Sequence, residues 1–197
     1  MDIQYYFTPV SPWTYLGHER FRAIAKAASA RVEVLPVDYG AIFPISGGLP
    51  LAKRAPQRQA YRLVELKRFS DWLKVPLNLQ PKFFPADAGP AARLLIVTQN
   101  AAGPQAAMTL AGAMMSAVWA EERNIAARDT LAALLEENTL ATALLAESEA
   151  PEAAARFEAN TKRAIDGGIF GAPSYVVDGE MFWGQDRLEF LERRLKG

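Results

Sequence analysis

The chain has 197 residues, half of them hydrophobic, which is enough for one sizeable core and an inserted subdomain. Its 22 Lys and Arg balance 22 Asp and Glu, so the charge pattern excludes an electrostatic footprint for nucleic acid or anionic lipid and favours a small, weakly anionic or uncharged partner. Because there is no cysteine, disulfides, thiolate metal sites and a dithiol redox cycle of the chain's own are also excluded.

The opening residues, MDIQYYF, lack the basic start and the long apolar stretch of a signal peptide. No later apolar run approaches the roughly 18 residues that are needed to span a bilayer. We therefore expect a cytoplasmic protein that has no membrane partner.

The first predicted elements form a β-α-β unit. Residues 3–7 are rich in aromatic and branched side chains and predict a strand. Ser11 and the proline after it predict the start of a helix that continues to Ala28, because serine caps a helix and proline tolerates its first position. Residues 32–37 predict a second, parallel strand. Residues 38–57 contain several Gly and Pro, which predicts a long loop near the active face.

From about residue 57 to residue 164 the pattern is helical almost throughout, which predicts an inserted helical subdomain. The expected helices are one with the stripe Leu63, Leu66, Phe69 and Leu73, two over 91–101 and 106–123, and shorter ones after Ala127, Thr139 and Pro151. The expected core residues of this part include Met108, Met114, Met115 and Trp119.

The last part of the chain returns to strand-like sequence. Residues 174–177 and 180–183 flank an Asp-Gly pair, which is a strong hairpin signal, and residues 184–187 then open an amphipathic helix. The order βαβ, helical insertion, ββα predicts an α/β protein with a thioredoxin-like core. The expected boundaries are 1–56 and 167–197 for the thioredoxin-like domain and 57–166 for the inserted helical subdomain.

Ser11 is the first candidate for chemistry. A helix N-terminus stabilises an anion by about 0.3 to 1 kcal/mol, and a thiolate is such an anion. The Ser11 hydroxyl can donate a hydrogen bond to sulfur, which would lower the pKa of a bound thiol from roughly 8.5 towards neutrality. The only histidine, His18, is expected to be an exposed or half-buried helix residue, so a serine-hydrolase triad is unsupported. The alternative is that Ser11 is only a helix cap.

Three motifs carry a family resemblance that covers nearly the whole chain. They are YF at 6–7 with SPWTYL at 11–16, GAPS at 171–174, and WGQDRL at 183–188. In order and spacing they resemble the 2-hydroxychromene-2-carboxylate isomerase family, a relative of the kappa-class glutathione transferases within the DsbA-like thioredoxin superfamily.

The resemblance implies a glutathione site and no metal. Ser11 would contact the glutathione sulfur, and the backbone of Ala172, before a cis Pro173, would pair with the cysteinyl backbone like an added strand. The γ-glutamyl end would be held by Gln185, Asp186 and Arg187. The carboxylate of a small aromatic substrate would be received by Lys53 or Arg54. Relatives in the family also imply a homodimer.

The implied reaction is a glutathione-dependent cis-trans isomerisation in aromatic catabolism. It would interconvert 2-hydroxychromene-2-carboxylate, or a similar catabolite, and trans-o-hydroxybenzylidenepyruvate by reversible thiolate addition. Two alternatives stay open from the sequence. One is a kappa-type glutathione transferase or peroxidase, and the other is a non-catalytic thioredoxin-fold binding module.

Overall fold

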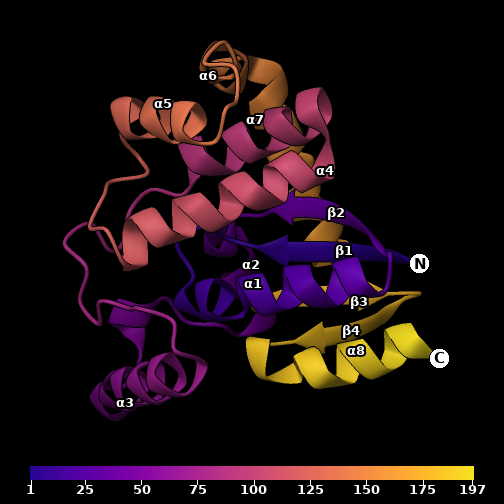
Figure 1. Ribbon diagram of the computed structural model, residues 1–197. Helices are drawn as coiled ribbons and strands as arrows, with labels where there is room; N and C mark the ends of the chain where they lie inside the picture. The colour runs from indigo at the N-terminus through magenta and orange to yellow at the C-terminus, as the bar shows by residue number, and fades with distance from the viewer.

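The computed structural model describes residues 1–197 and has a four-stranded mixed sheet at its centre (Figure 1). The strands lie in the order β2-β1-β3-β4, with β1 parallel to β2 and antiparallel to β3. The turn between β3 and β4 is Asp178-Gly179, and both residues have positive φ. The strand bounds, each within one residue of those predicted, are β1 (Asp2–Phe7), β2 (Arg31–Pro36), β3 (Ser174–Val177) and β4 (Glu180–Trp183).

Helices cover both faces of the sheet. The α-helices are α1 (Pro12–Ala27), α2 (Tyr39–Ser46), α3 (Pro56–Leu73), α4 (Gly89–Trp119), α5 (Arg128–Glu137), α6 (Leu144–Glu149), α7 (Pro151–Asp166) and α8 (Leu188–Lys196). Two short 3-10 helices are η1 (Leu51–Lys53) and η2 (Gln185–Arg187). None of the helices combines the length and the apolarity that crossing a membrane requires.

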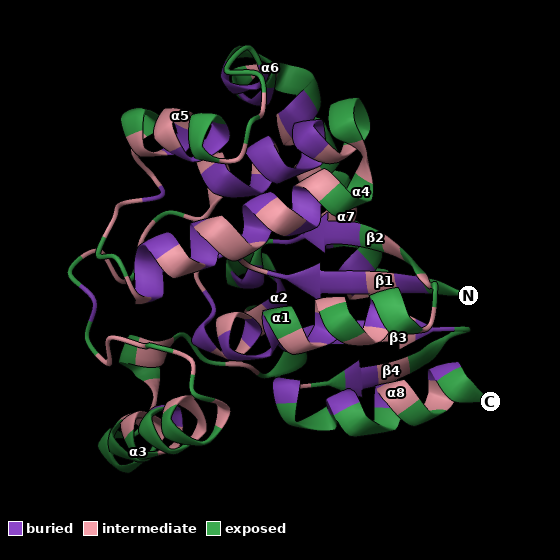
Figure 2. Cartoon of the chain, viewed as in Figure 1, coloured by how far each residue is buried: buried purple, intermediate pink, exposed green.

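The two faces of β1 lie in two separate hydrophobic clusters, because successive side chains of a strand point in opposite directions. Tyr5 and Phe7 belong to a cluster of 32 buried residues, to which α1, α4 and α8 contribute. Tyr6 belongs to a smaller cluster with side chains of α2 and α7. Buried residues accordingly line both sides of the sheet, whereas α3 is mostly exposed (Figure 2).

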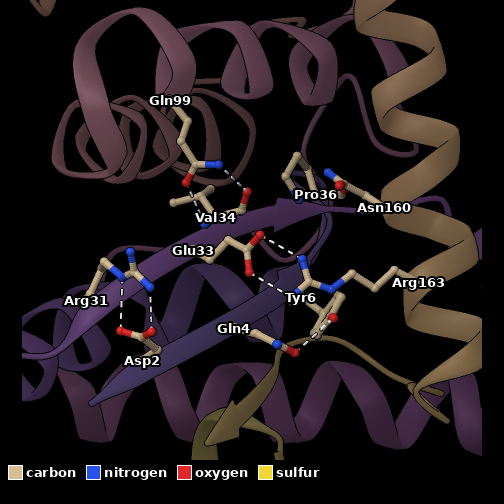
Figure 3. A network of polar contacts seen from close by, with 10 residues as sticks. All are labelled: Asp2, Gln4, Tyr6, Arg31, Glu33, Val34, Pro36, Gln99, Asn160 and Arg163. Carbon is tan, nitrogen blue, oxygen red and sulfur yellow. Dashed lines mark hydrogen bonds and ion pairs between the residues drawn. The ribbon is translucent and has the colours of Figure 1, made fainter.

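The free edge of β2 is covered by a side chain of α4 (Figure 3). The Gln99 amide accepts a hydrogen bond from the Val34 N–H at 2.7 Å and donates one to the Val34 carbonyl at 3.1 Å. Arg163 of α7 forms a bidentate pair with Glu33 on the same strand. The Gln99 bonds satisfy main-chain groups of Val34 at an edge that would otherwise be open to another strand, and the Arg163–Glu33 pair joins α7 to the same strand.

The long loop predicted over 38–57 is wrong in part, because it contains α2 and η1. The Asp38 carboxylate caps α2 by accepting from the Gly40 N–H at 2.7 Å, and Gly47 ends it in the left-handed conformation. Pro44 lies inside this helix. The glycines and prolines that predicted a loop therefore mark the boundaries of a short helix as well.

The two helices predicted over 91–101 and 106–123 are the two halves of α4, which is broken at Gly103 (φ 86°, ψ 168°) before Pro104. Met108, Met114, Met115 and Trp119 are all buried, as predicted. The large cluster draws side chains from both sides of the expected boundaries 1–56, 57–166 and 167–197. The division into two domains stays a prediction.

Candidate functional site

The register of the sheet brings three loops together at one end of its strands. Ser174 is paired with Tyr6 on one side and with Trp183 on the other. The segment that precedes Ser174, the segment that follows β1 and the segment that follows β4 therefore lie together. A hydrogen bond of 2.8 Å from the Gly184 N–H to the Pro173 carbonyl joins two of them directly.

Ser11 is the N-cap of α1, as predicted. Its Oγ accepts a hydrogen bond from the Thr14 N–H at 3.2 Å, and its carbonyl accepts from the Tyr15 N–H at 3.0 Å. The Ser11 side chain is used only as an acceptor, so its hydroxyl proton has no partner within the protein. Only 8% of the residue is exposed. The N-terminus of α1 thus carries a buried hydroxyl that can donate a hydrogen bond to an anion, and the positive end of the helix dipole lies beside it.

The Ala172–Pro173 peptide bond is cis, as expected. The Gly171 carbonyl before it accepts from the Tyr39 hydroxyl and from the Ser174 hydroxyl, both at 2.7 Å. By contrast, the N–H and the carbonyl of Ala172 hydrogen-bond to no other residue, and Ala172 is partly exposed. The loop is fixed on both sides of Ala172 and leaves that residue's backbone free to pair with an extended peptide.

Gly171 permits a close approach of Trp183 to the same loop. A Cβ at this position would lie 2.2 Å from the Trp183 Nε1. The Trp183 ring also packs against Phe170, with ring centroids 4.8 Å apart. The loop before Pro173 is therefore covered by an aromatic side chain from β4.

The third loop presents charges. Gly184 has φ 104°, which glycine adopts without strain, and η2 follows it. Asp186 and Arg187 form an ion pair at 2.7 Å, and both side chains are about half exposed. Gln185 differs from its neighbours, because it is 2% exposed and its Oε1 accepts from Arg20 at 3.2 Å. Its side chain is used within the protein, which leaves the N–H as its group for a ligand.

Gly17 fixes α1 against this third loop. A Cβ at Gly17 would lie 2.6 Å from the Gln185 Cβ, so only glycine allows the helix and η2 to pack this closely. The hydrogen bond between Arg20 and Gln185 lies one turn further along α1. The helix that carries Ser11 and the turn that carries Asp186 are thereby held in one arrangement.

Lys53 and Arg54 lie at the C-terminal end of η1, which is not one of the three loops that meet at Ser174. Lys53 is exposed; its N–H donates to the Pro50 carbonyl at 2.9 Å, and its side chain makes no hydrogen bond or ion pair. The Arg54 Nε donates to the Leu49 carbonyl at 2.8 Å, and the Arg54 carbonyl accepts from Gln59 at 2.8 Å. Arg54 is therefore partly used to hold its own loop.

The expectation that His18 is exposed or half-buried is wrong, since only 1% of it is exposed. Its Nε2 lies 2.9 Å from the Met108 carbonyl and its Nδ1 lies 3.1 Å from the Tyr5 hydroxyl. A carbonyl only accepts, so Nε2 carries the proton and Nδ1 accepts from Tyr5. Burial lowers the pKa of His18 to about 4, which keeps the ring neutral. His18 is a structural residue with both nitrogens satisfied.

Sequence reasoning missed Tyr39 and Arg20, which support the site through Gly171 and Gln185. Burial raises the pKa of Tyr39, so its hydroxyl stays protonated and donates. The partners of these two residues are 132 and 165 positions away in the chain, and no local pattern signals such contacts.

No group of three or more His, Asp or Glu side chains is placed to hold a metal ion.

The fold and the three loops are those of a thioredoxin-type protein in which serine stands at the helix start. A family model for the DsbA-like thioredoxin domain matches residues 2–196, and the chain belongs to this family.

Among curated proteins, the chain is 27% identical over 195 residues to a 2-hydroxychromene-2-carboxylate isomerase from Sphingobium xenophagum, covering 98% of this chain and 97% of the relative. A solved structure of 2-hydroxychromene-2-carboxylate isomerase matches with a TM-score of 0.83 at 23% identity, covering 100% of this chain and 95% of the other. The cytosolic disulfide reductase DsbM from Pseudomonas aeruginosa, solved with GSH, matches with a TM-score of 0.73 at 16% identity, covering 100% of both chains. The predicted fold and the predicted resemblance are both confirmed.

Proposed function

We propose that this protein is a glutathione-dependent cis-trans isomerase that acts on 2-hydroxychromene-2-carboxylate or a similar aromatic catabolite. The observation that carries the proposal is the Ser11 hydroxyl, whose proton is unused at the N-terminus of α1 in a chain without cysteine. Relatives at 27% identity that are named isomerases support the activity, and the DsbM structure solved with GSH supports the cofactor.

The residues present fit a tripeptide thiol. The free N–H and carbonyl of Ala172 match the backbone of a cysteinyl residue, which would pair there as an added strand. The exposed Asp186 carboxylate suits the ammonium group of the γ-glutamyl end, and Arg187 pairs with its carboxylate or braces Asp186. The main-chain N–H of Gln185, which has no partner in the protein, is a further donor for that carboxylate.

When bound, glutathione supplies a thiolate that adds reversibly to a conjugated double bond and so lets that bond rotate. The chain's own task is to keep the sulfur ionised and in place. Ser11 donates a hydrogen bond to the sulfur, and the N-terminal N–H groups of α1 stabilise its negative charge. Since nothing is oxidised or reduced, the absence of a cysteine pair is compatible with this reaction. Lys53 and Arg54 are candidates for the substrate carboxylate.

The test begins with the bound thiol. Ultraviolet thiolate absorbance as a function of pH is expected to give a glutathione pKa below its value of roughly 8.5 in water when the protein is present. In Ser11→Ala the pKa should return towards that value, whereas Ser11→Thr, which keeps the hydroxyl, should preserve most of the shift. If glutathione does not bind, or binds with an unshifted pKa, the proposal fails.

Two substrates then separate the classes of activity. Conversion of the chromene carboxylate to its trans ring-opened isomer without consumption of glutathione supports the isomerase. Consumption of glutathione with a chlorodinitrobenzene, and no isomerisation, would instead identify a kappa-type transferase. Thiol activation without turnover of either compound would indicate a binding module.

A further inference from the structure

The two outer edges of the sheet differ in what covers them. At the β2 edge, the Gln99 amide hydrogen-bonds to both main-chain groups of Val34. At the opposite edge, β4 pairs with β3 and no strand lies beyond it (Figure 1). Apart from its ladder with β3, no main-chain group of β4 takes part in a hydrogen bond. The β4 edge is therefore open.

The register shows which main-chain groups face outwards at this edge. In a hairpin with a two-residue turn, the residues that flank the turn, Val177 and Glu180, exchange their main-chain hydrogen bonds, and such pairs alternate along the strands. The Gly184 bond to the Pro173 carbonyl continues this alternation. Met181 and Trp183 are the intervening positions of β4, so their N–H and carbonyl groups point away from β3.

A hollow of about 410 Å³ lies at the same edge. It is lined by all of β4 together with Phe170, Arg187 and Phe190. Met181 packs against the small hydrophobic cluster and Phe182 belongs to the large one, so the hollow is bounded from both faces of the sheet.

Aromatic side chains gather around the hollow and remain accessible. Phe170, Trp183 and Phe190 are 38%, 50% and 55% exposed. Contiguous exposed apolar surface of this kind marks an interaction site, whereas edge strands that stay unpaired usually carry charged side chains. Outward-facing main-chain groups between exposed aromatic side chains fit an added strand, which would bond to the edge and be covered on both faces.

The edge is complementary to a second copy of itself. When two β4 strands run antiparallel with Phe182 opposite Phe182 of the second copy, Met181 of each lies opposite Trp183 of the other. Both outward-facing residues then exchange N–H···O bonds across the interface. Any other register leaves only one such pair within β4. The Met181 side chain also lies beside the Trp183 ring of the second copy, which is a favourable contact for a thioether.

The charges at the hollow agree with this alignment. Glu180 begins β4 and Arg187 follows its end, and both side chains are about half exposed. Antiparallel pairing places Glu180 opposite Gly184 of the second copy, and so beside the turn that carries its Arg187. Asp186, the internal partner of Arg187, does not line the hollow. Opposite charges therefore meet at both ends of the interface.

We infer that this protein forms a symmetric dimer through β4, in which the two four-stranded sheets join into one continuous sheet. The same surface of each copy contacts the other, as a two-fold axis requires. The inference does not depend on glutathione or on the proposed reaction, because it uses only the sheet edge and the side chains around it.

Sedimentation equilibrium of the wild type and variants measures the dissociation constant of the dimer. Met181→Pro removes an N–H that β3 does not use, a change that edge strands tolerate. It deletes one bond per copy, and the dissociation constant should rise about thirty-fold. Phe190→Lys places a cation from each copy beside the interface and should raise it at least about tenfold. The matched control, Trp72→Lys, removes an aromatic side chain that is 67% exposed on α3 and should change nothing.

Cross-linking tests the alignment itself. Since the chain has no cysteine, Met181→Cys introduces a single thiol. The proposed register puts the two Met181 positions on neighbouring strands and two residues apart, a separation of about 8 Å. A short bismaleimide should therefore join the Met181→Cys copies into a covalent dimer, whereas Trp72→Cys should remain uncross-linked.

A dimer that is weakened by Met181→Pro or by Phe190→Lys, but not by Trp72→Lys, supports the inference. Circular dichroism identifies a variant that has lost its fold, and the exposed Phe190 position then carries the test. A wild type that is monomeric at micromolar concentrations would overturn the inference. So would a dissociation constant that neither variant changes, weakening by Trp72→Lys, or failure of Met181→Cys to cross-link in a folded dimer.

Discussion

Ser11 and His18 are polar residues on the same helix, about two turns apart, and they are used in opposite ways. Both ring nitrogens of His18 have partners, Met108 and Tyr5, inside the large core. Ser11 uses its oxygen to cap α1 and keeps an unused proton. Burial is similar, since the two residues are 1% and 8% exposed, so burial alone does not separate them.

What separates them is remaining hydrogen-bond capacity. A buried polar group whose donors and acceptors are all filled contributes to stability and offers nothing to a ligand. A buried group with one unfilled donor at a helix N-terminus offers a binding contact. This contrast predicts that substitutions at His18 change the free energy of unfolding, whereas substitutions at Ser11 change mainly the chemistry of the bound thiol.

The largest expected effect on stability is that of His18→Leu. This substitution leaves the Tyr5 hydroxyl buried without a partner and removes the hydrogen bond that His18 donates to the Met108 carbonyl, which should lower the free energy of unfolding by about 3 kcal/mol. Urea denaturation measures it, with Glu19→Gln as a control at the exposed neighbouring position. A loss below about 1 kcal/mol would show that the His18 contacts are not the structural element described above.

The pH dependence of stability sharpens the same point. The pKa of His18 is about 4 in the folded protein and 6.5 in its ordinary state, so between pH 7 and pH 4.5 the unfolded chain takes up a proton that the folded chain does not. The contribution of His18 to stability is therefore complete above pH 6.5 and should fall by on the order of 2 to 3 kcal/mol by pH 4.5. Urea midpoints at the two pH values measure the fall.

The control for this pH effect is the His18→Leu variant, which shares every carboxylate with the wild type. Because His18 is the only histidine, the difference between the two pH profiles isolates its contribution. Parallel profiles would contradict a neutral, buried His18.

Ser11→Ala should cost less stability, about 1 kcal/mol for the lost helix cap. Its main effect should be a rise in the pKa of bound glutathione by roughly one unit or more. Ser11→Asp separates the two roles, because aspartate caps a helix as well as serine but repels a thiolate. We expect it to preserve the melting temperature while raising the thiol pKa further. Equal thiol pKa values in the two variants and the wild type would reduce Ser11 to a cap.

The smallest effect on stability is expected at Asp186, whose pair with Arg187 is about half exposed. Asp186→Asn should change the free energy of unfolding by only a few tenths of a kcal/mol. It should nevertheless weaken glutathione binding about tenfold if the carboxylate binds the ammonium group. Asp178→Asn removes a comparable exposed carboxylate far from the site and should leave the affinity unchanged. Equal affinities in both variants would remove Asp186 from the site.

Signals between neighbouring residues predicted most of the fold, including the two elements on which the candidate site is built. The Asp178-Gly179 turn fixed the β3-β4 hairpin, and the Ser11-Pro12 pair fixed the start of α1, because these preferences act between neighbours in the chain. α2 was missed because Pro44, Gly47 and Gly48 suggested a loop, and the capping role of Asp38 went unnoticed.

Contacts between distant segments could not be predicted in this way. His18 can be buried because the Met108 carbonyl, 90 residues away, accepts a hydrogen bond from its Nε2–H. The buried Gln185 side chain accepts a hydrogen bond from Arg20, 165 residues away. The setting of Arg62 depends on Phe84 and Trp119, which reach it from two other segments. The residues that neighbour each of them in the sequence do not indicate these contacts, which arise only in the tertiary fold.

The close contact between Gly17 and Gln185 has a consequence for the kinetics of binding. Since α1 and η2 pack without a side chain between them, we expect the proposed sulfur subsite and the proposed γ-glutamyl subsite to move as one rigid body. A ligand then loses its own conformational freedom on binding, while the protein loses little. Association should accordingly follow a single exponential in stopped-flow experiments, with no slow phase from closure of the glutathione site.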